Sequence, residues 1–351
     1  MRKTRSLRRT ALITGGAGFV GTNLADHLLE TGRRVRILDD LSRPGVERNL
    51  TWLQERHGPA LEVEIADVRD PAAVGSALKG VESVFHFAAQ VAVTTSLDEP
   101  FEDAEVNVRG TLNLLEAARR QPRPPIVLFT STNKVYGSLE DLELVIRAER
   151  YEPADAASRS GVGEDRPLSF CTPYGCSKGA ADQYVVDWSR SYGVPTVVFR
   201  MSCIYGPHQQ GNEDQGWVAH FALSALQEEP ITLFGDGRQV RDILYVDDLV
   251  RAFLIAEERA TDFAGRAFNI GGGPENAVSL LDVIDLLAAV RGEAPALRHE
   301  PWRPGDQRYY VSDYSSFTET TGWRPSVDPA DGVRLLHSWL VNEREAAQAA
   351  A

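Results

Sequence analysis

The sequence has few cysteines, no long apolar run and no excess of positive charge. Its 351 residues include three cysteines, too few for a disulfide framework, which favours a reducing compartment, and we expect a cytoplasmic protein. No segment approaches the roughly 18 apolar residues of a membrane span, so no membrane partner is expected. The net charge of -13 argues against a nucleic-acid partner, because phosphate binding on that scale needs a basic face.

The chain ends carry no further signal. The first ten residues are basic, but no apolar segment follows them, so residues 1–10 are expected to form a disordered tail. Residues 341–351 are expected to form a C-terminal tail. His86 and His220 share no ligand spacing with a cysteine or an acid, so no metal site is expected.

Short apolar runs alternate with helix-length segments across the first two hundred residues. The expected strands are Ala11–Thr14, Val35–Asp39, Leu61–Ala66, Ser83–Ala88, Ile126–Ser131 and Thr196–Arg200. The expected helices include Phe19–Thr31, Glu102–Arg120 and Pro173–Tyr192. This alternation predicts an α/β fold, a Rossmann-type doubly wound parallel sheet covered on both faces. After residue 200, glycine, proline and tryptophan become frequent, which indicates a smaller C-terminal α/β part.

A glycine-rich segment, TGGAGFVG at residues 14–21, lies between the first strand and the first helix. Its glycines fit the G-x-G-x-x-G spacing, which lets backbone N–H groups approach a pyrophosphate at a helix N-terminus. Asp39 ends the next strand, where an acid suits the ribose 2′-hydroxyl of NAD and repels the 2′-phosphate of NADP, although Arg43 lies nearby. The residues expected at the cofactor are Gly15, Gly18, Phe19, Val20, Gly21 and Asp39.

Tyr174 and Lys178 lie four residues apart in a helix that is expected to begin at Thr172 as N-cap and Pro173 as N1. They therefore share one helix face. An ammonium group and a cationic nicotinamide both favour the phenolate form of a neighbouring tyrosine, which can then take a hydroxyl proton while hydride leaves the same carbon. The pair predicts a catalytic base that also contacts the cofactor.

These motifs together resemble the extended short-chain dehydrogenases/reductases, the group of NAD-dependent nucleotide-sugar epimerases and dehydratases. The resemblance runs from about residue 11 to 340 and implies a catalytic triad of Thr132, Tyr174 and Lys178. It implies an NAD-binding domain of residues 11–200 with about 240–262, and a substrate-binding part of about 201–239 and 263–340. It also implies further cofactor contacts by Asp67, Val68, Phe87, Ala88, Ala89, Gln90 and Asn107.

Three longer strings, at residues 131–137, 173–184 and 214–218, resemble the narrower group that inverts C2 of a CDP-hexose. This implies hydride removal at C2, a 2-keto intermediate and hydride return to the opposite face. Arg241 and Arg303 are expected at the nucleotide diphosphate, whose oxygens match guanidinium forks. The remaining expected substrate contacts are Thr94, Asn133, Ser202 and Trp217. The sequence departs from the group where Met201, in place of a histidine, follows Arg200.

Other outcomes on the same fold stay open. They include a 4-epimerase, a 4,6-dehydratase, a decarboxylase, a net oxidoreductase that releases NADH, and a non-catalytic NAD-binding sensor. Asn133 and Lys134 stand where the dehydratases of the family carry an Asp-Glu pair, which argues against elimination. The resemblance also implies a homodimer or homotetramer, formed through the helices around residues 102–120 and 173–192.

Overall fold

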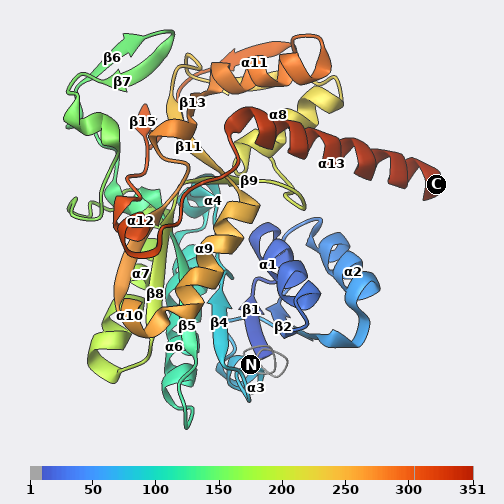
Figure 1. Ribbon diagram of the computed structural model, residues 1–351, viewed down its shortest axis with the longest axis vertical. Helices are drawn as coiled ribbons and strands as arrows, with labels where there is room; N and C mark the ends of the chain where they lie inside the picture. The colour runs from blue at the N-terminus through green and yellow to red at the C-terminus, as the bar shows by residue number, and fades with distance from the viewer. Residues whose placement is uncertain (1–9, 304, 351) are drawn as a thin grey trace. The chain divides into compact units, whose positions relative to one another are not determined.

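The computed structural model describes residues 10–303 and 305–350, which divide into two compact units (Figure 1). Unit 1 holds the residues up to 135 together with 170–200 and 250–268. Unit 2 holds residues 136–169, 201–249 and those from 269 onward.

Unit 1 is built on a seven-stranded sheet with the strand order β12-β8-β5-β4-β1-β2-β3. The strands are β1 (Thr10–Thr14), β2 (Arg34–Asp39), β3 (Leu61–Ile65), β4 (Ser83–His86), β5 (Ile126–Thr132), β8 (Thr196–Met201) and β12 (Arg266–Ile270). β3, β2, β1, β4 and β5 are mutually parallel. The strand order reverses between β1 and β4, and ligands of open α/β sheets bind beyond the carboxyl ends of the strands at such a point.

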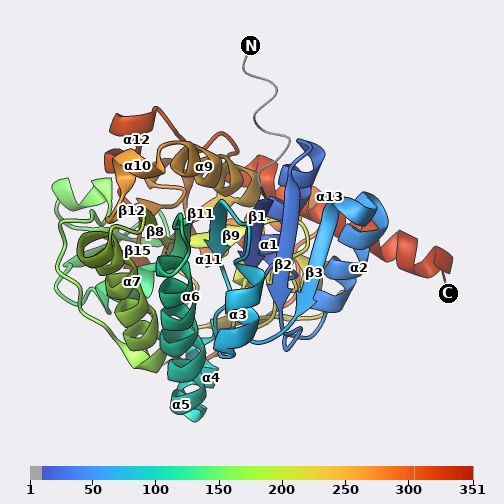
Figure 2. The ribbon, with the colours of Figure 1, turned by 90° about the horizontal axis from the view of Figure 1, so that it is seen from below.

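Helices cover both faces of this sheet. They are α1 (Phe19–Glu30), α2 (Val46–His57), α3 (Pro71–Ala77), α4 (Val93–Asp98), α5 (Pro100–Ala104), α6 (Gly110–Arg119), α7 (Thr172–Tyr192), α9 (Val246–Glu258) and α10 (Ala260–Phe263). Short 3-10 helices, η2 (Gly58–Ala60) and η4 (Asn133–Tyr136), and a π-helix, η3 (Glu105–Arg109), connect them, and the first four residues of α9 and the last residue of η4 belong to unit 2. Figure 2 shows α3, α6 and α7 in a row on one face, where their apolar side chains form one core with β1, β4 and β5. The predicted doubly wound fold is confirmed.

Unit 2 packs helices against short strands. The strands are β6 (Leu144–Arg147), β7 (Arg150–Pro153), β9 (Cys203–Tyr205), β10 (Ile231–Phe234), β11 (Val240–Tyr245), β13 (Ala277–Ser279), β14 (Leu297–Glu300) and β15 (Tyr309–Tyr310). The helices are α8 (Trp217–Leu226), α11 (Leu280–Arg291), α12 (Ser315–Thr321) and α13 (Pro329–Ala350), with the turns η5 (Ala157–Ser160) and η6 (Pro274–Asn276). α8, α11 and α13 share a core with β9–β11. Ser279 and Asp282 form a capping box that fixes the start of α11.

The observed division of the chain differs from the predicted one. The sequence assigns residues 136–169 and 240–249 to the NAD-binding domain, but they belong to unit 2. Long-range pairing explains this, because Tyr151 N–H donates to the Arg238 carbonyl (3.0 Å) and β11 pairs with β9, β13 and β15. Residues 263–268 belong to unit 1, because β12 is an edge strand of its sheet.

The two predicted tails also have different outcomes. Of the expected tail 1–10, residues 1–9 lie outside the described part of the chain, and Thr10 begins β1. The expected C-terminal tail continues α13 as far as Ala350. Within residues 10–303 and 305–350, none of the helices is both long and apolar enough to cross a membrane.

Candidate active site

The turn between β1 and α1 forms a close-packed glycine cradle. Gly15 has a φ of +68°, and a Cβ there would lie 2.7 Å from the Ala88 nitrogen, in the loop after β4. A Cβ on Gly21 would lie 2.4 Å from the Gly15 oxygen, so only glycine fits both positions. No side chain of the described residues caps the start of α1, where Gly18, Phe19 and Val20 are half-buried. This helix end therefore presents N–H donors to an anion.

Asp39, at the end of β2, is fixed against the cradle. Its Oδ2 accepts the Ala17 N–H at 2.9 Å and its Oδ1 accepts the Leu41 N–H at 2.9 Å. Burial raises the pKa of this carboxyl, and the two backbone bonds oppose the shift. Asp39, the predicted ribose ligand, thus lies against the cradle, while Arg43 is exposed in the following loop.

The loop after β4 is tied to the segment between α5 and α6. The Gln90 N–H donates to Asn107 Oδ1 (2.9 Å), and Asn107 Nδ2 donates to the Gln90 carbonyl (3.0 Å). Phe87, Ala88 and Ala89 lead from β4 to this contact and are half-buried. Asn107 is 1% exposed, so it orders this loop from within.

Asp67 and Val68 follow β3. The Asp67 carboxylate accepts from Arg69 Nε at 2.8 Å, and this hydrogen bond lowers the pKa of Asp67. Val68 is buried, and a Cβ on Gly110 would lie 2.7 Å from its Cγ2. Val68 therefore packs against the start of α6.

Thr132, Tyr174 and Lys178 lie together in unit 1, where β5 ends and α7 begins. They are 8%, 8% and 4% exposed, which removes them from bulk water. A hydrogen bond joins the side chains of Thr132 and Tyr174, and Lys178 Nζ lies 4.3 Å from the centre of the Phe129 ring. The predicted triad thus shares one place in the structure.

Burial acts on the two ionisable members in opposite directions. It raises the pKa of Tyr174 to about 12, against the hydrogen bond with Thr132, which lowers it. It lowers the pKa of Lys178 to about 7, against the negative charges of Asp182 and Asp103, which raise it. Both shifts oppose the charged forms, as desolvation requires. A base made from this pair therefore needs a neighbouring positive charge.

The start of α7 differs from the prediction. Thr172 is expected as N-cap, but the helix already includes it and Cys171 precedes it. Thr172 has a φ of +65°, an uncommon value for a β-branched residue. Its hydroxyl nevertheless accepts the Gly175 N–H at 3.4 Å, so it satisfies a donor of the first turn.

Comparison with known proteins assigns these elements to a family. A model described as the NAD dependent epimerase/dehydratase family matches residues 11–271. The chain belongs to the NAD dependent epimerase/dehydratase family. The predicted family and its NAD dependence are thereby confirmed.

Characterised members of the family match nearly the whole chain. CDP-paratose 2-epimerase of Salmonella typhi is 41% identical over 335 residues, which cover 93% of this chain and 98% of that protein. UDP-glucose 4-epimerase of Mycolicibacterium smegmatis is 34% identical, and the match covers 95% of this chain and 99% of that protein. The crystal structure of UDP-glucose 4-epimerase from Thermotoga maritima with UDP-glucose has a TM-score of 0.82 at 31% identity. The match covers 95% of this chain and 99% of the chain in that structure.

The remaining predicted substrate residues are divided between the units. In unit 1, Thr94 on α4 has a buried hydroxyl without a hydrogen-bond partner among the described residues. Asn133 is 7% exposed, and its Oδ1 accepts from the Thr132 hydroxyl at 3.3 Å. Both therefore place polar groups in unit 1 beside the elements that carry the triad.

The four predicted residues of unit 2 all contact other groups of that unit. Arg241 Nη2 donates to Asp306 at 2.8 Å, and Arg303 Nη1 donates to the Glu213 carbonyl at 2.6 Å. The Ser202 hydroxyl donates to the backbone carbonyl of Asp242 at 2.9 Å.

The Trp217 indole N–H donates to the Cys203 thiol at 3.4 Å, and its ring meets Phe221 edge-on. These contacts give Trp217 a packing role in unit 2.

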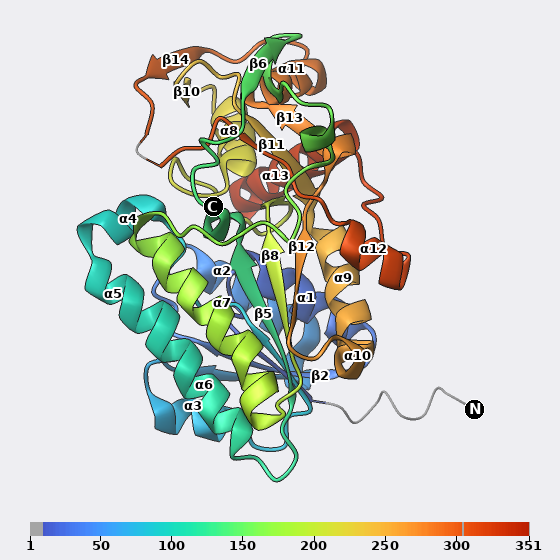
Figure 3. The ribbon, with the colours of Figure 1, turned by 90° about the vertical axis from the view of Figure 1, so that its left-hand side faces the viewer.

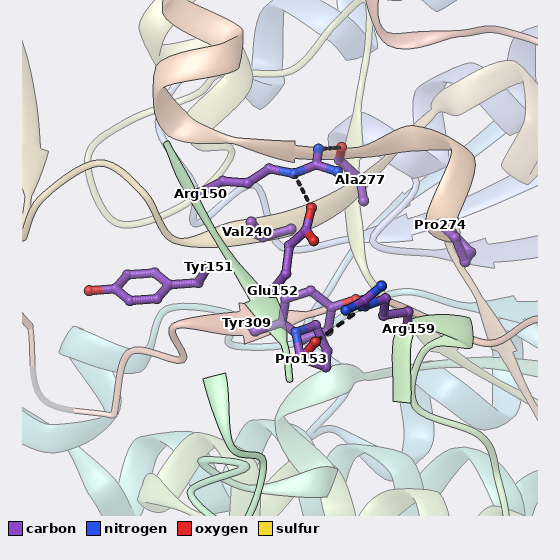
Figure 4. A pocket seen from close by; sticks show the side chains of 9 residues that line it. All are labelled: Arg150, Tyr151, Glu152, Pro153, Arg159, Val240, Pro274, Ala277 and Tyr309. Carbon is purple, nitrogen blue, oxygen red and sulfur yellow. Dashed lines mark hydrogen bonds and ion pairs between the residues drawn. The ribbon is translucent and has the colours of Figure 1, made fainter. Parts of the chain in front are cut away.

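A separate cavity of about 140 Å³ lies under the β6–β7 hairpin of unit 2 (Figure 4). Its charged side chains are hydrogen-bonded within the unit, since Arg150 Nε donates to Glu152 at 3.1 Å and Arg159 Nε donates to the Pro153 carbonyl at 3.3 Å. Across the described ranges, no group of three or more His, Cys, Asp or Glu side chains could hold a metal ion.

Two buried groups beside the triad have no site role in the sequence prediction: His86, which it considers only as a metal ligand, and Asp103, which it does not name. The histidine hydrogen-bonds Thr14 and Thr111, and the aspartate accepts hydrogen bonds from Gln90 and Asn107. One signal was present, because Asp103, Asn107 and Thr111 recur every fourth residue, on one helix face.

Proposed function

We propose that this chain is a nucleotide-sugar epimerase that inverts C2 of a CDP-hexose through a keto intermediate. The observation that carries the proposal is that Thr132, Tyr174 and Lys178 lie together where β5 ends and α7 begins. The sheet that contains β5 also contains β1, which leads into the glycine cradle. The 41% identity to CDP-paratose 2-epimerase supports the choice of nucleotide and carbon.

The residues of unit 1 fit NAD. The cradle has positions where a Cβ would collide with backbone, and it leads into a helix end without a side-chain cap, as a pyrophosphate requires. When bound, NAD supplies the acceptor and donor for the hydride of the sugar carbon. The residues proposed to hold it are Gly15, Gly18, Phe19, Val20, Gly21, Asp39, Asp67, Val68, Phe87, Ala88, Ala89, Gln90, Asn107, Tyr174 and Lys178.

Within this site Tyr174 is the proposed acid and base. As phenolate, its oxygen takes the proton of the sugar hydroxyl when the carbon–hydrogen bond breaks, and it returns that proton when the bond forms again. Lys178, as ammonium, stabilises the phenolate by Coulomb attraction. The Thr132 hydroxyl, which already bonds Tyr174, orients the reacting oxygen.

Asn133 disfavours an elimination. A dehydratase needs a group at this position that can donate a proton to the leaving hydroxyl. The Asn133 amide has no acidic proton, and its oxygen accepts a hydrogen bond from Thr132. The keto intermediate is therefore proposed to keep its other hydroxyl groups, which leaves inversion as the outcome.

Arg241 and Arg303 of unit 2 are the proposed diphosphate ligands. Arg241 is 7% exposed, and its guanidinium is oriented by Asp306 (2.8 Å). Arg303 lies 3.6 Å from the centre of the Phe234 ring, which fixes its plane. Oriented forks of this kind bind phosphate oxygens in pairs. We propose Ser202, Trp217, Thr94 and Asn133 as further substrate contacts.

Proton NMR of the purified protein with CDP-, UDP- and GDP-hexoses in D2O tests the function. We expect a new stereoisomer of a CDP-hexose with altered couplings at C2, no deuterium in the sugar and no accumulation of NADH. The Tyr174→Phe variant is the matched control. Deuterium uptake, loss of water or inversion at another carbon would contradict the 2-epimerase proposal.

We also propose that the protein is a homodimer or homotetramer formed through α5, α6 and α7, which lie side by side (Figure 3). Phe101 on α5 is 86% exposed, and Tyr184 and Tyr192 on α7 are 41% and 50% exposed. Exposed aromatic side chains on neighbouring helices are typical of an interface. Light scattering after size exclusion is expected to give at least twice the chain mass of 38.6 kDa, and a monomer at micromolar concentration would refute the interface.

A cytoplasmic location is proposed from cysteine chemistry. Cys171, Cys176 and Cys203 form no disulfide in the described part of the chain, as a reducing compartment favours. Cell fractionation tests this, and recovery from the membrane or the medium would contradict it.

A further inference from the structure

A buried chain of hydrogen bonds links the cradle strand to the catalytic helix within unit 1. Thr14, at the end of β1, bonds His86 Nδ1 at 2.7 Å, and His86 Nε2 bonds the Thr111 hydroxyl at 3.0 Å. Thr111 in turn donates to the Asn107 carbonyl at 2.6 Å. Asn107 Nδ2 then donates to the Ser177 hydroxyl on α7 at 2.9 Å. The chain therefore passes from β1 to the helix that carries Tyr174 and Lys178.

The Thr111 hydroxyl determines which groups donate and which accept along this chain of hydrogen bonds. Thr111 donates to a carbonyl, so its oxygen accepts from His86, which must carry its proton on Nε2. His86 Nδ1 then accepts a hydrogen bond from the Thr14 hydroxyl. Burial, with Lys178 adding to it, lowers the pKa of His86 to about 3, so the ring stays neutral. His86 contributes hydrogen bonds and no charge to the site.

Asp103, one turn before Asn107, is the buried acid of this network. Its side chain is 0% exposed, and its Oδ1 accepts from Gln90 Nε2 at 2.9 Å and from Asn107 Nδ2 at 3.2 Å. Its Oδ2 is buried without a hydrogen-bond partner among the described residues. An acid in such surroundings is costly, and two amide bonds do not require a charge. Burial raises the pKa of Asp103, and the positive charge of Lys178 is one of the influences that lower it again, so the two groups act on each other.

We propose that Asp103 is a positioning residue, a fixed negative charge within unit 1 that favours the ammonium form of Lys178 and holds Gln90 and Asn107 in place. The inference rests on the proposed function, in which Lys178 acts as a cation. Asp103 raises the pKa of both Lys178 and Tyr174, as a nearby carboxylate must. Asp182, on α7, raises the pKa of Lys178 in the same way. His86 is neutral, so these two acids are the charges that oppose the desolvation of Lys178.

The variant Asp103→Asn separates the charge from the hydrogen bonds. The asparagine oxygen can accept from Gln90 and Asn107, and its NH2 group takes the place of an oxygen that accepts no bond. Removing a negative charge lowers the pKa of every neighbouring group. We therefore expect the pKa of Lys178 to fall by about 0.5 or more. The variant Asp103→Glu restores the charge and is expected to restore most of this pKa.

The test measures the pKa of Lys178 directly and does not depend on catalytic activity. The chain has only four lysines, so NMR of protein labelled with 13C-lysine gives few side-chain signals, and Lys178→Met assigns the one of interest. The holoenzyme is titrated as wild type, Asp103→Asn and Asp187→Asn, the last removing an exposed acid of α7 as the control. A Lys178 pKa that is lower in Asp103→Asn than in the other two proteins supports the proposal. An equal Lys178 pKa in all three proteins overturns it.

Activity gives a second readout. If the protein is an epimerase, both limbs of the profile of kcat/KM against pH move to lower pH in Asp103→Asn and stay in place in Asp187→Asn. Should Asp103→Asn fail to fold, Asp103→Ser removes the same charge with a smaller side chain. A protein that converts no CDP-hexose contradicts the proposed function but leaves the lysine titration to decide the role of Asp103.

Discussion

Replacing Lys178 by methionine should stabilise the protein while it removes activity. Lys178 is 4% exposed, and burial lowers the pKa of its ammonium group from 10.5 to about 7. In the unfolded chain the group keeps its ordinary pKa. Between pH 7 and 10.5 the unfolded state therefore binds more protons at this position than the native state does, and the free energy of unfolding rises with pH.

The size of the effect follows from the same two pKa values. Each pKa unit corresponds to about 1.36 kcal/mol, and at pH 7 half of the native groups are already neutral, so burying this lysine costs about 4 kcal/mol at that pH. Methionine has a similar length and no charge. We expect Lys178→Met to raise the free energy of unfolding at pH 7 by about 2–4 kcal/mol, because packing differences offset part of the gain.

Urea denaturation of NAD-free protein, followed by tryptophan fluorescence at pH 7, 8 and 9, measures this. The advantage of Lys178→Met should shrink by about 1 kcal/mol per pH unit. Lys79→Met, at an exposed position, is the matched control and should show no such trend. A variant that is less stable at pH 7, or an advantage that does not change with pH, would refute the reasoning.

Three further changes have defined outcomes. Tyr174→Phe should lower kcat by about 10³-fold or more in the NMR assay while NAD affinity in a fluorescence titration stays near wild type; substantial residual turnover would remove the proposed base. Gly21→Ala puts a Cβ 2.4 Å from a backbone oxygen of the cradle and should weaken NAD binding at least about tenfold by calorimetry. Gly75→Ala, whose Cβ meets nothing within 4 Å, should leave binding unchanged. Arg200→Met removes the cation that bonds the fully buried Asp182 and should lower the unfolding free energy by about 3–5 kcal/mol; equal stability in urea would contradict this.

Unit 1 could be predicted from sequence because its signals are local. Six of the seven strands of its sheet are short apolar runs next to turn residues, as in Ile126–Thr132, whose side chains are almost all buried. The seventh, β12, was not predicted, because it follows the sixth strand by about 65 residues and joins the sheet only through pairing with β8. The cradle and the Tyr174–Lys178 pair lie at junctions between such strands and helices, so their positions follow from the strand–helix alternation. The family resemblance then supplied roles that spacing alone leaves open.

The rest depends on contacts between distant segments. The β6–β7 hairpin has no alternating pattern, and it is held to unit 2 by Tyr151, whose hydroxyl donates to Asp236 at 2.8 Å. His86 and Asp103 could not be identified because their partners come from separate elements, such as Thr14, 72 residues before His86. The start of α7 was misplaced because a threonine at φ +65° is a tertiary effect that no propensity predicts.

The buried face of α7 shows what the polarity of a helix stripe alone would not predict. Tyr174, Lys178 and Asp182 follow one another every four residues, and all three are buried. An amphipathic helix is expected to bury its apolar residues, so periodicity alone predicts that this stripe of ionisable residues faces solvent. Apolar side chains of similar volume would pack there at less cost than ionisable ones. Packing therefore gives no reason to keep three ionisable groups on one buried stripe, and their chemistry does.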